Sequence, residues 1–101
     1  MIPRDSQLSK AKSMRELPIV IVKWEDSASM GRWRGFYTVR KESKLCECQS
    51  VGYLVANTAK KITLVQSISV EGDCTDSISI PKRCISRMSI LRRGLKGKES
   101  K

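Results

Sequence analysis

Residues 50–69, SVGYLVANTAKKITLVQSIS, place two runs rich in apolar residues on either side of a short polar segment. In the second run, ITLVQSISV (62–70), alternate residues fall on opposite faces, as the two-residue period of a β-strand requires. The polar segment NTAKK (57–61) has the length of a hairpin loop. The pattern therefore predicts an antiparallel β-hairpin in the middle of the chain.

The first strand of this hairpin, LCECQSVGYLVA (45–56), is long and carries Gly52 in its middle. A glycine inside a strand marks a bend, a bulge or the close approach of another backbone. We therefore expect the strand to bend at Gly52, which would curl the sheet.

Three other segments have the composition of strands. PIVIVKWED (18–26) is rich in β-branched residues, SISIP (77–81) stops at a proline, and SRMSIL (86–91) follows the tight turn KRCI. Five strands joined by short turns, one of them strongly bent, indicate a small all-β barrel. The residues expected to be largely buried in it are Val20, Val22, Leu54, Ile62, Leu64, Ile68, Ile80, Ile85 and Ile90.

The segment GRWRGFYTVRKE (31–42) is ambiguous, because Trp33, Phe36, Tyr37 and Val39 are near helical spacing while a glycine interrupts them. It predicts a short helix or an irregular crossing over one end of the sheet. Its aromatic side chains would then form a lid on the core or, alternatively, a platform for a ligand.

The chain of 101 residues has the size of one small domain, and its formal charge is +10. We expect a flexible N-terminal arm (1–16), a small β-barrel domain (17–91) and a basic C-terminal tail (92–101). The tail alone has five basic residues and one acidic residue. Such a tail attracts nucleic acid or an anionic membrane, or simply increases solubility.

No run approaches the roughly 18 apolar residues of a membrane span, and residues 1–16 lack the apolar core of a signal peptide. The sequence therefore predicts a cytoplasmic protein that does not bind a membrane. In that compartment the four cysteines are expected to be reduced.

Cys46 and Cys48 lie two apart in a strand, so both point to one face and are close enough to chelate a metal. Cys74 and Cys84 fall in turns, and the overall spacing differs from the paired Cys-x2-Cys of zinc ribbons. Free thiols are the favoured interpretation, with a zinc site and a disulfide as alternatives. We therefore predict no metal site and no cofactor.

Catalytic patterns are missing from the sequence. The chain has no histidine to activate a cysteine nucleophile, and its glycines form no phosphate-binding loop. The carboxylates fall at strand ends and in turns, where acidic residues are ordinary. We therefore expect a protein that is not an enzyme.

The order of a bent hairpin, a short strand, the one-turn junction IPKRCI and a final strand resembles that of Sm-like (SH3-type) barrels. The segments SVGYLV, ITL and IPKRCISRMSIL are also similar to a family of small proteins of bacteriophages and prophages. The resemblance implies rings of subunits that bind single-stranded RNA through loop residues, in the host cytoplasm if the gene is phage-borne. The positions that correspond to those loops are Asn57, Lys60, Lys61, Lys82 and Arg83, although the Asp-x-x-x-Asn and Arg-Gly patterns of Sm proteins are missing there.

Cations interleaved with aromatic rings are the second feature that indicates nucleic-acid binding, because rings stack on bases while cations attract phosphates. Arg32, Trp33 and Arg34 have this arrangement, and Arg92 and Arg93 begin the basic tail. The leading hypothesis is a homo-oligomer that binds nucleic acid or a nucleotide-like anionic ligand. The alternative is a protein-interaction module that docks on a host protein, for example as an inhibitor of host defence; a zinc-stabilised structural protein is a third.

Overall fold

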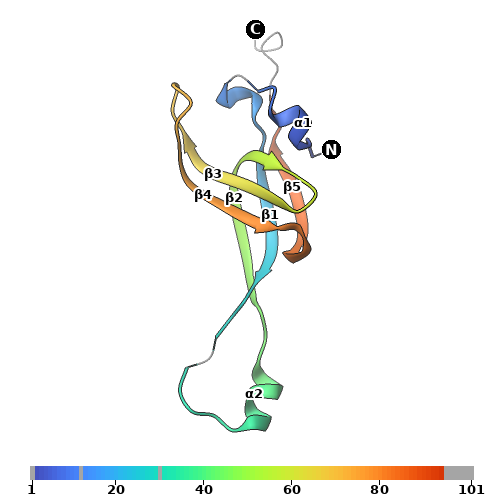
Figure 1. Ribbon diagram of the computed structural model, residues 1–101, viewed down its shortest axis with the longest axis vertical. Coiled ribbons are helices and arrows are strands. Elements are labelled where there is room, and N and C mark those ends of the chain that lie inside the picture. Colours follow the sequence, from blue (N-terminus) through green and yellow to red (C-terminus); the bar gives the residue numbers. More distant parts are fainter. Residues whose placement is uncertain (1, 12, 30, 95–101) are drawn as a thin grey trace.

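A computed structural model describes residues 2–11, 13–29 and 31–94. Its main feature is one sheet of five antiparallel strands in the order β4-β3-β2-β1-β5 (Figure 1). The strands are β1 (Ile19–Asp26), β2 (Cys46–Asn57), β3 (Lys61–Ile68), β4 (Cys74–Pro81) and β5 (Ile85–Arg92). The all-β class and the five strands are therefore confirmed. The sheet is open, because no pairing joins its two edge strands, β4 and β5, in the described residues.

Four short helical segments complete the part of the fold that the structure describes. They are α1 (Asp5–Leu8), the 3-10 turn η1 (Met14–Glu16), α2 (Phe36–Glu42) and the 3-10 turn η2 (Lys82–Cys84). The η2 turn connects the two edge strands, as the tight turn KRCI predicted.

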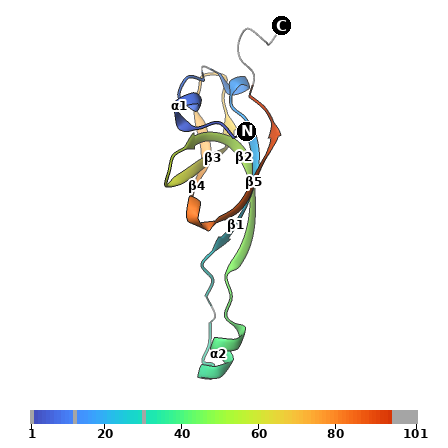
Figure 2. The same ribbon diagram turned by 90° about the vertical axis from the view of Figure 1, so that its right-hand side faces the viewer.

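The strand β2 is shared between two parts of the sheet. Residues 46–53 of β2 pair with β1, and the residues from Tyr53 onwards pair with β3. A Cβ atom added at Gly52 would lie 2.8 Å from the carbonyl oxygen of Val65 and 3.2 Å from the Cβ of Leu64. Glycine is therefore required here because β3 crosses close to β2, and a register shift follows between Leu54 and Ala56. As a result, β3 and β4 curl over the face of the other strands (Figures 1 and 2).

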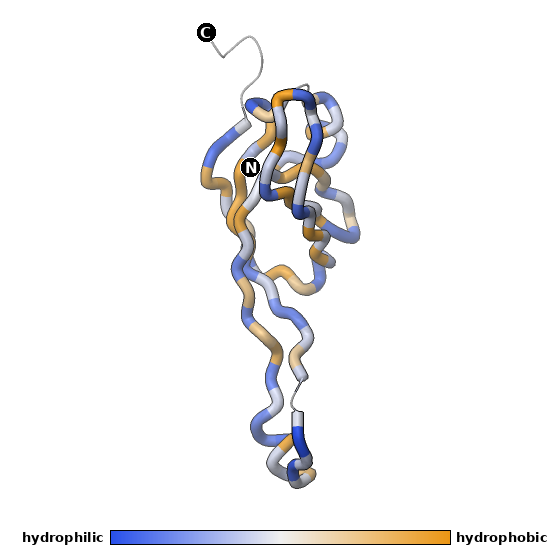
Figure 3. Tube along the Cα trace, turned by 90° about the vertical axis from the view of Figure 1, so that its left-hand side faces the viewer, coloured by the Kyte–Doolittle hydropathy of each residue, from blue (hydrophilic) through white to orange (hydrophobic). Residues whose placement is uncertain are grey.

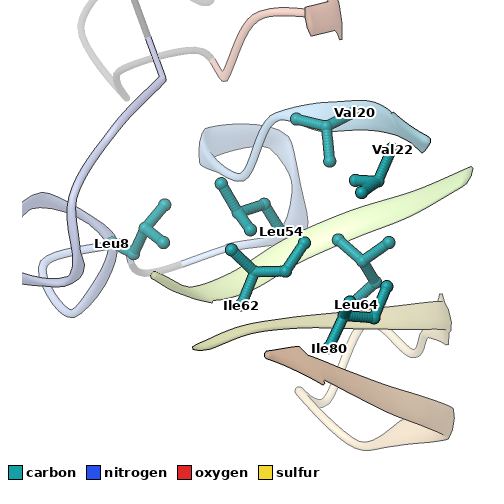
Figure 4. Packing of buried hydrophobic residues seen from close by; sticks show 7 residues of the cluster. All are labelled: Leu8, Val20, Val22, Leu54, Ile62, Leu64 and Ile80. Carbon is teal, nitrogen blue, oxygen red and sulfur yellow. The ribbon is translucent and has the colours of Figure 1, made fainter. Parts of the chain in front are cut away.

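The core lies inside this curl (Figure 4). Six of the nine residues expected there are fully buried, namely Val20, Val22, Leu54, Ile62, Leu64 and Ile80. Ile85 and Ile90 are half-buried and pack against this cluster, and Ile68, at the end of β3, is also half-buried. Leu8 and Val65 are also buried, although the sequence pattern did not predict their burial.

The N-terminal segment differs from the flexible arm that the sequence predicted. Leu8 belongs to the core cluster, and Ile2 packs against the cluster. The backbone N–H of Asn57 donates to Asp5 Oδ1 (2.9 Å), and the Asn57 side-chain amide donates to the carbonyl of Pro3 (2.7 Å). The segment therefore closes one end of the core, which its mixed composition does not reveal.

Residues 27–29 and 31–45, which we call the arm, project away from the sheet and carry α2 at their tip (Figure 1). The molecule consequently measures 62 × 25 × 20 Å, with a radius of gyration of 17.4 Å, against about 13 Å for a compact chain of 100 residues. The expected helix is present, but the interpretation of its aromatic residues as a core lid is wrong. The β1–β2 ladder directs the arm away from the core (Figure 3), and the rings of Trp33, Phe36 and Tyr37 are consequently exposed.

Candidate nucleic-acid interface

Two basic pairs from different parts of the chain meet at one end of the sheet. Lys61 is the register partner of Pro81 in the β3–β4 ladder. The backbone N–H of Lys82 also donates to the carbonyl of Lys60 at 2.8 Å. The pairs Lys60/Lys61 and Lys82/Arg83 are therefore adjacent, and we refer to these four residues as the basic end.

The local conformation at the basic end is set by Thr58. Its hydroxyl accepts hydrogen bonds from the backbone N–H groups of Lys60 and Lys61, both at 3.2 Å, and its own N–H donates to the carbonyl of Lys61 at 2.9 Å. Sequence reasoning missed this residue, although a threonine in a polar turn is a known signal for such a bond. On the other side, Pro81 leads into η2 with φ −61°, the value its ring favours.

The positive charge of the basic end is not neutralised within the described residues, where none of its four side chains forms an ion pair with a carboxylate. Lys60, Lys61 and Arg83 are exposed and Lys82 is half-buried. The segments 57–61 and 81–84 contain no acidic residue. Four neighbouring cations without counter-charges create a local positive potential that attracts an anion.

Asn57 does not belong to this exposed surface. It is only 7% exposed, and its amide is held by the N-terminal segment, as described above. Its Oδ1 atom is buried and has no hydrogen-bond partner among the described residues. The structure thus gives Asn57 an anchoring role and separates it from the exposed cations with which the sequence grouped it.

Arg92 has structural contacts of its own. Its Nη2 donates to the carbonyls of Met14 (3.3 Å) and Leu17 (3.2 Å), and its guanidinium lies 5.6 Å from the centroid of the Tyr53 ring. Arg92 therefore ties the end of β5 to η1 and to the residue that follows η1, and both Arg92 and the adjacent Arg93 are exposed. Residues 95–101 of the expected basic tail lie outside the described residues.

The third group of predicted site residues lies at the tip of the arm, far from the basic end (Figure 1). Trp33 is fully exposed, and Arg32 has a left-handed backbone with φ 69°. Arg34 forms a 3.4 Å salt bridge with Glu42. The tip is thus partly ordered by its own contacts, with its largest ring free in solvent.

The helix α2 carries two more aromatic rings, which contact each other and a cation. The rings of Phe36 and Tyr37 meet edge to face at 5.4 Å, and the Arg40 guanidinium lies 5.8 Å from the centroid of Phe36. Phe36 and Tyr37 are nevertheless 67% and 81% exposed. The tip therefore displays cations and rings together, separately from the basic end.

All four cysteines are free thiols. Cys46 and Cys48, at the start of β2, have their sulfurs 3.8 Å apart. Desolvation, followed by the neighbouring Cys46 and Asp26, raises the pKa of the Cys48 thiol. No group of three or more His, Cys, Asp or Glu side chains that could hold a metal occurs in the part of the chain that the structure describes.

Comparison of the chain with family models, curated proteins and solved structures gives no match. In the described ranges, no helix is long and apolar enough to pass through a membrane. Any functional assignment therefore depends on the surfaces described above.

Proposed function

We propose that this protein binds single-stranded nucleic acid, or a nucleotide-like anionic ligand, without catalysing a reaction. The observation that carries this proposal is the 2.8 Å hydrogen bond between the Lys82 N–H and the Lys60 carbonyl, which joins the two basic pairs. Attraction between such cations and phosphate groups supplies essentially all of the affinity that proteins have for nucleic acid independently of its sequence. Arg93 and the basic tail add further cations to the same attraction.

The proposal includes self-association through the edges of the sheet. The edge strands β4 and β5 carry the exposed apolar side chains of Ile78 and Leu91. Unpaired edges readily accept a strand of another chain. Pairing of β4 of one copy with β5 of the next would cover both edges and arrange the curled sheets as in Sm-like rings, with several basic ends gathered together. Light scattering at micromolar concentration is expected to give a mass well above that of one 11.4 kDa chain.

The central test compares two variants that each lose four positive charges and a tail variant that loses three. Fluorescence anisotropy with short single-stranded RNA and DNA, at two salt concentrations, would measure binding by the unaltered chain and by three variants. In the first, the four residues of the basic end are replaced by alanine. In the second, four cations of the arm are replaced instead, namely Arg32, Arg34, Arg40 and Lys41. In the third, the tail residues Lys96, Lys98 and Lys101 become serine, which leaves the Arg92 contacts in place.

We expect the basic-end variant to lose most of its affinity and the arm variant to keep it. Each phosphate neutralised adds about 0.7 to the slope of log affinity against log salt for a single strand, so the lost contacts are also expected to flatten the salt dependence. Loss only in the tail variant would show that the sheet does not contact the ligand. Absence of binding by the unaltered chain at low salt would refute the proposal.

The arm supports a second candidate function, docking on a host protein, for instance as an inhibitor of host defence. Its three exposed rings, Trp33, Phe36 and Tyr37, are of the residue types that dominate protein–protein interfaces. Capture of a partner from host lysate by the unaltered chain, lost when these three residues become alanine and insensitive to salt, would favour this function. Equal capture by the unaltered chain and by the triple alanine variant would argue against docking through the arm.

A further inference from the structure

Cys46 and Cys48 lie at the base of the arm, where the arm joins β2, and their sulfur atoms are in contact. Cys46 and Cys48 are separated by one residue of β2, and the register places them opposite Asp26 and Trp24 of β1. Because residues two apart in a strand share a face, both thiols lie on the same side of the ladder. Their sulfurs are 3.8 Å apart, and Cys46 is exposed to solvent.

This separation matches the geometry of a tetrahedral metal–thiolate centre. Zinc binds thiolate sulfur at about 2.3 Å, so two sulfurs on one zinc ion are separated by about 3.8 Å. The pair therefore needs no backbone change to bind one Zn²⁺ through both sulfurs. Each thiol would release its proton to solvent as its zinc–sulfur bond forms.

The described part of one chain cannot complete such a centre. No third metal-binding side chain joins the pair there, and the whole sequence has no histidine. Cys74 lies at the start of β4 and Cys84 in η2, and neither forms a metal-binding group with the pair in the described residues. All four cysteines are placed in the structure and the sequence has no histidine, so two further sulfur or nitrogen ligands must come from another molecule.

We propose that Cys46 and Cys48 form half of a zinc site, which a second copy of the chain completes with its own pair around a single Zn²⁺. A two-fold axis through the metal would make this contact self-complementary, as in most homodimers. The base of the arm stands clear of the curled strands β3 and β4, so a second copy can reach it (Figure 2). The inference does not depend on the proposed nucleic-acid binding, nor on pairing between sheet edges.

The test uses the full chain, stripped of metal by a chelator and kept reduced with a phosphine. Zinc is then added, and the bound metal per chain is measured together with the mass by light scattering. We expect about one zinc per two chains, a doubling of the zinc-free mass, and reversal of both by chelator. Cobalt in place of zinc is expected to give the absorption spectrum of a four-thiolate tetrahedral site.

Two double variants provide the contrast. Cys46→Ser/Cys48→Ser is expected to abolish stoichiometric zinc binding and the doubling, while Cys74→Ser/Cys84→Ser retains both. Circular dichroism would verify that each variant keeps its strands. One zinc per chain without a change of mass would overturn the shared site, as would equal binding by the two variants. Nucleic-acid binding measured in chelator reports on the proposed function separately.

Discussion

The sheet and the arm contain similar side chains in opposite surroundings. Trp24, in β1, packs against the core, and its indole N–H donates to Ser50 Oγ at 3.0 Å. Trp33, in the arm, is fully exposed. Likewise Leu64 is 1% exposed in β3, whereas Leu45 is 56% exposed at the end of the arm. The difference shows that burial depends on whether a second surface is within reach, since the residue types are the same.

The sheet and the arm also differ in what their apolar side chains do, since those of the sheet stabilise the fold and those of the arm are free to contact a partner. In the sheet, apolar area removed from water contributes roughly 25 cal/mol per Å² to folding. The rings of the arm make little such contribution, so they are available to a partner. Substitutions in matched pairs, one in each region, can break or sharpen this division.

The largest effect is expected from the leucine pair. Leu64→Ala removes a fully buried side chain from the core cluster and should destabilise the protein by about 2–5 kcal/mol. Leu45→Ala, the control in the arm, should change the free energy of unfolding by less than about 0.5 kcal/mol. Urea denaturation followed by circular dichroism measures both. Equal midpoints for the two variants would contradict the core described here.

A smaller effect is expected from the glycine pair. Gly52→Ala places a Cβ atom 2.8 Å from the Val65 carbonyl oxygen, and the required shift of β3 should destabilise the protein by about 1–3 kcal/mol. Gly31→Ala has nothing within 4 Å of its new Cβ. Thermal melting should therefore distinguish the two variants. An unchanged melting temperature for Gly52→Ala would mean that β2 and β3 do not cross as closely as described.

The smallest effect is expected from the tryptophan pair. Trp24→Phe keeps most of the packing but loses the bond to Ser50, at a cost of about 1 kcal/mol. Trp33→Phe should leave stability unchanged. Acrylamide should quench the fluorescence of Trp33 more strongly than that of Trp24, as each variant retains a single tryptophan. Similar quenching of both would show that the arm is covered in solution.

Much of the sheet could be predicted because its signals are local. Alternation in 62–70 correctly indicated that Ile62 and Leu64 face the core, and Gly52 correctly indicated a close backbone approach. The alternation did not indicate the burial of Val65 at 3%, because that residue lies on the opposite face of the strand. Covering of that second face is a property of neighbouring segments and leaves no mark in the strand itself.

The candidate site was predictable only in part. The meeting of Lys60 with Lys82 follows from strand order and short turns, both visible in the sequence. The burial of Asn57 does not, because it depends on a segment more than fifty residues away in the chain. The contacts of Arg92 with Met14 and Leu17 are also long-range and were not predictable.

The sequence by itself determined the strands, the hairpin and the positive charge, because period, turn composition and charge are properties of neighbouring residues. Only the tertiary structure decided which apolar and polar groups are covered. It placed Leu8 in the core and left Trp33 in solvent, although both belong to segments rich in charged and polar residues. The physical reason is that the end of the sheet offers Leu8 an apolar surface to cover, whereas the β1–β2 ladder carries Trp33 beyond the reach of any such surface.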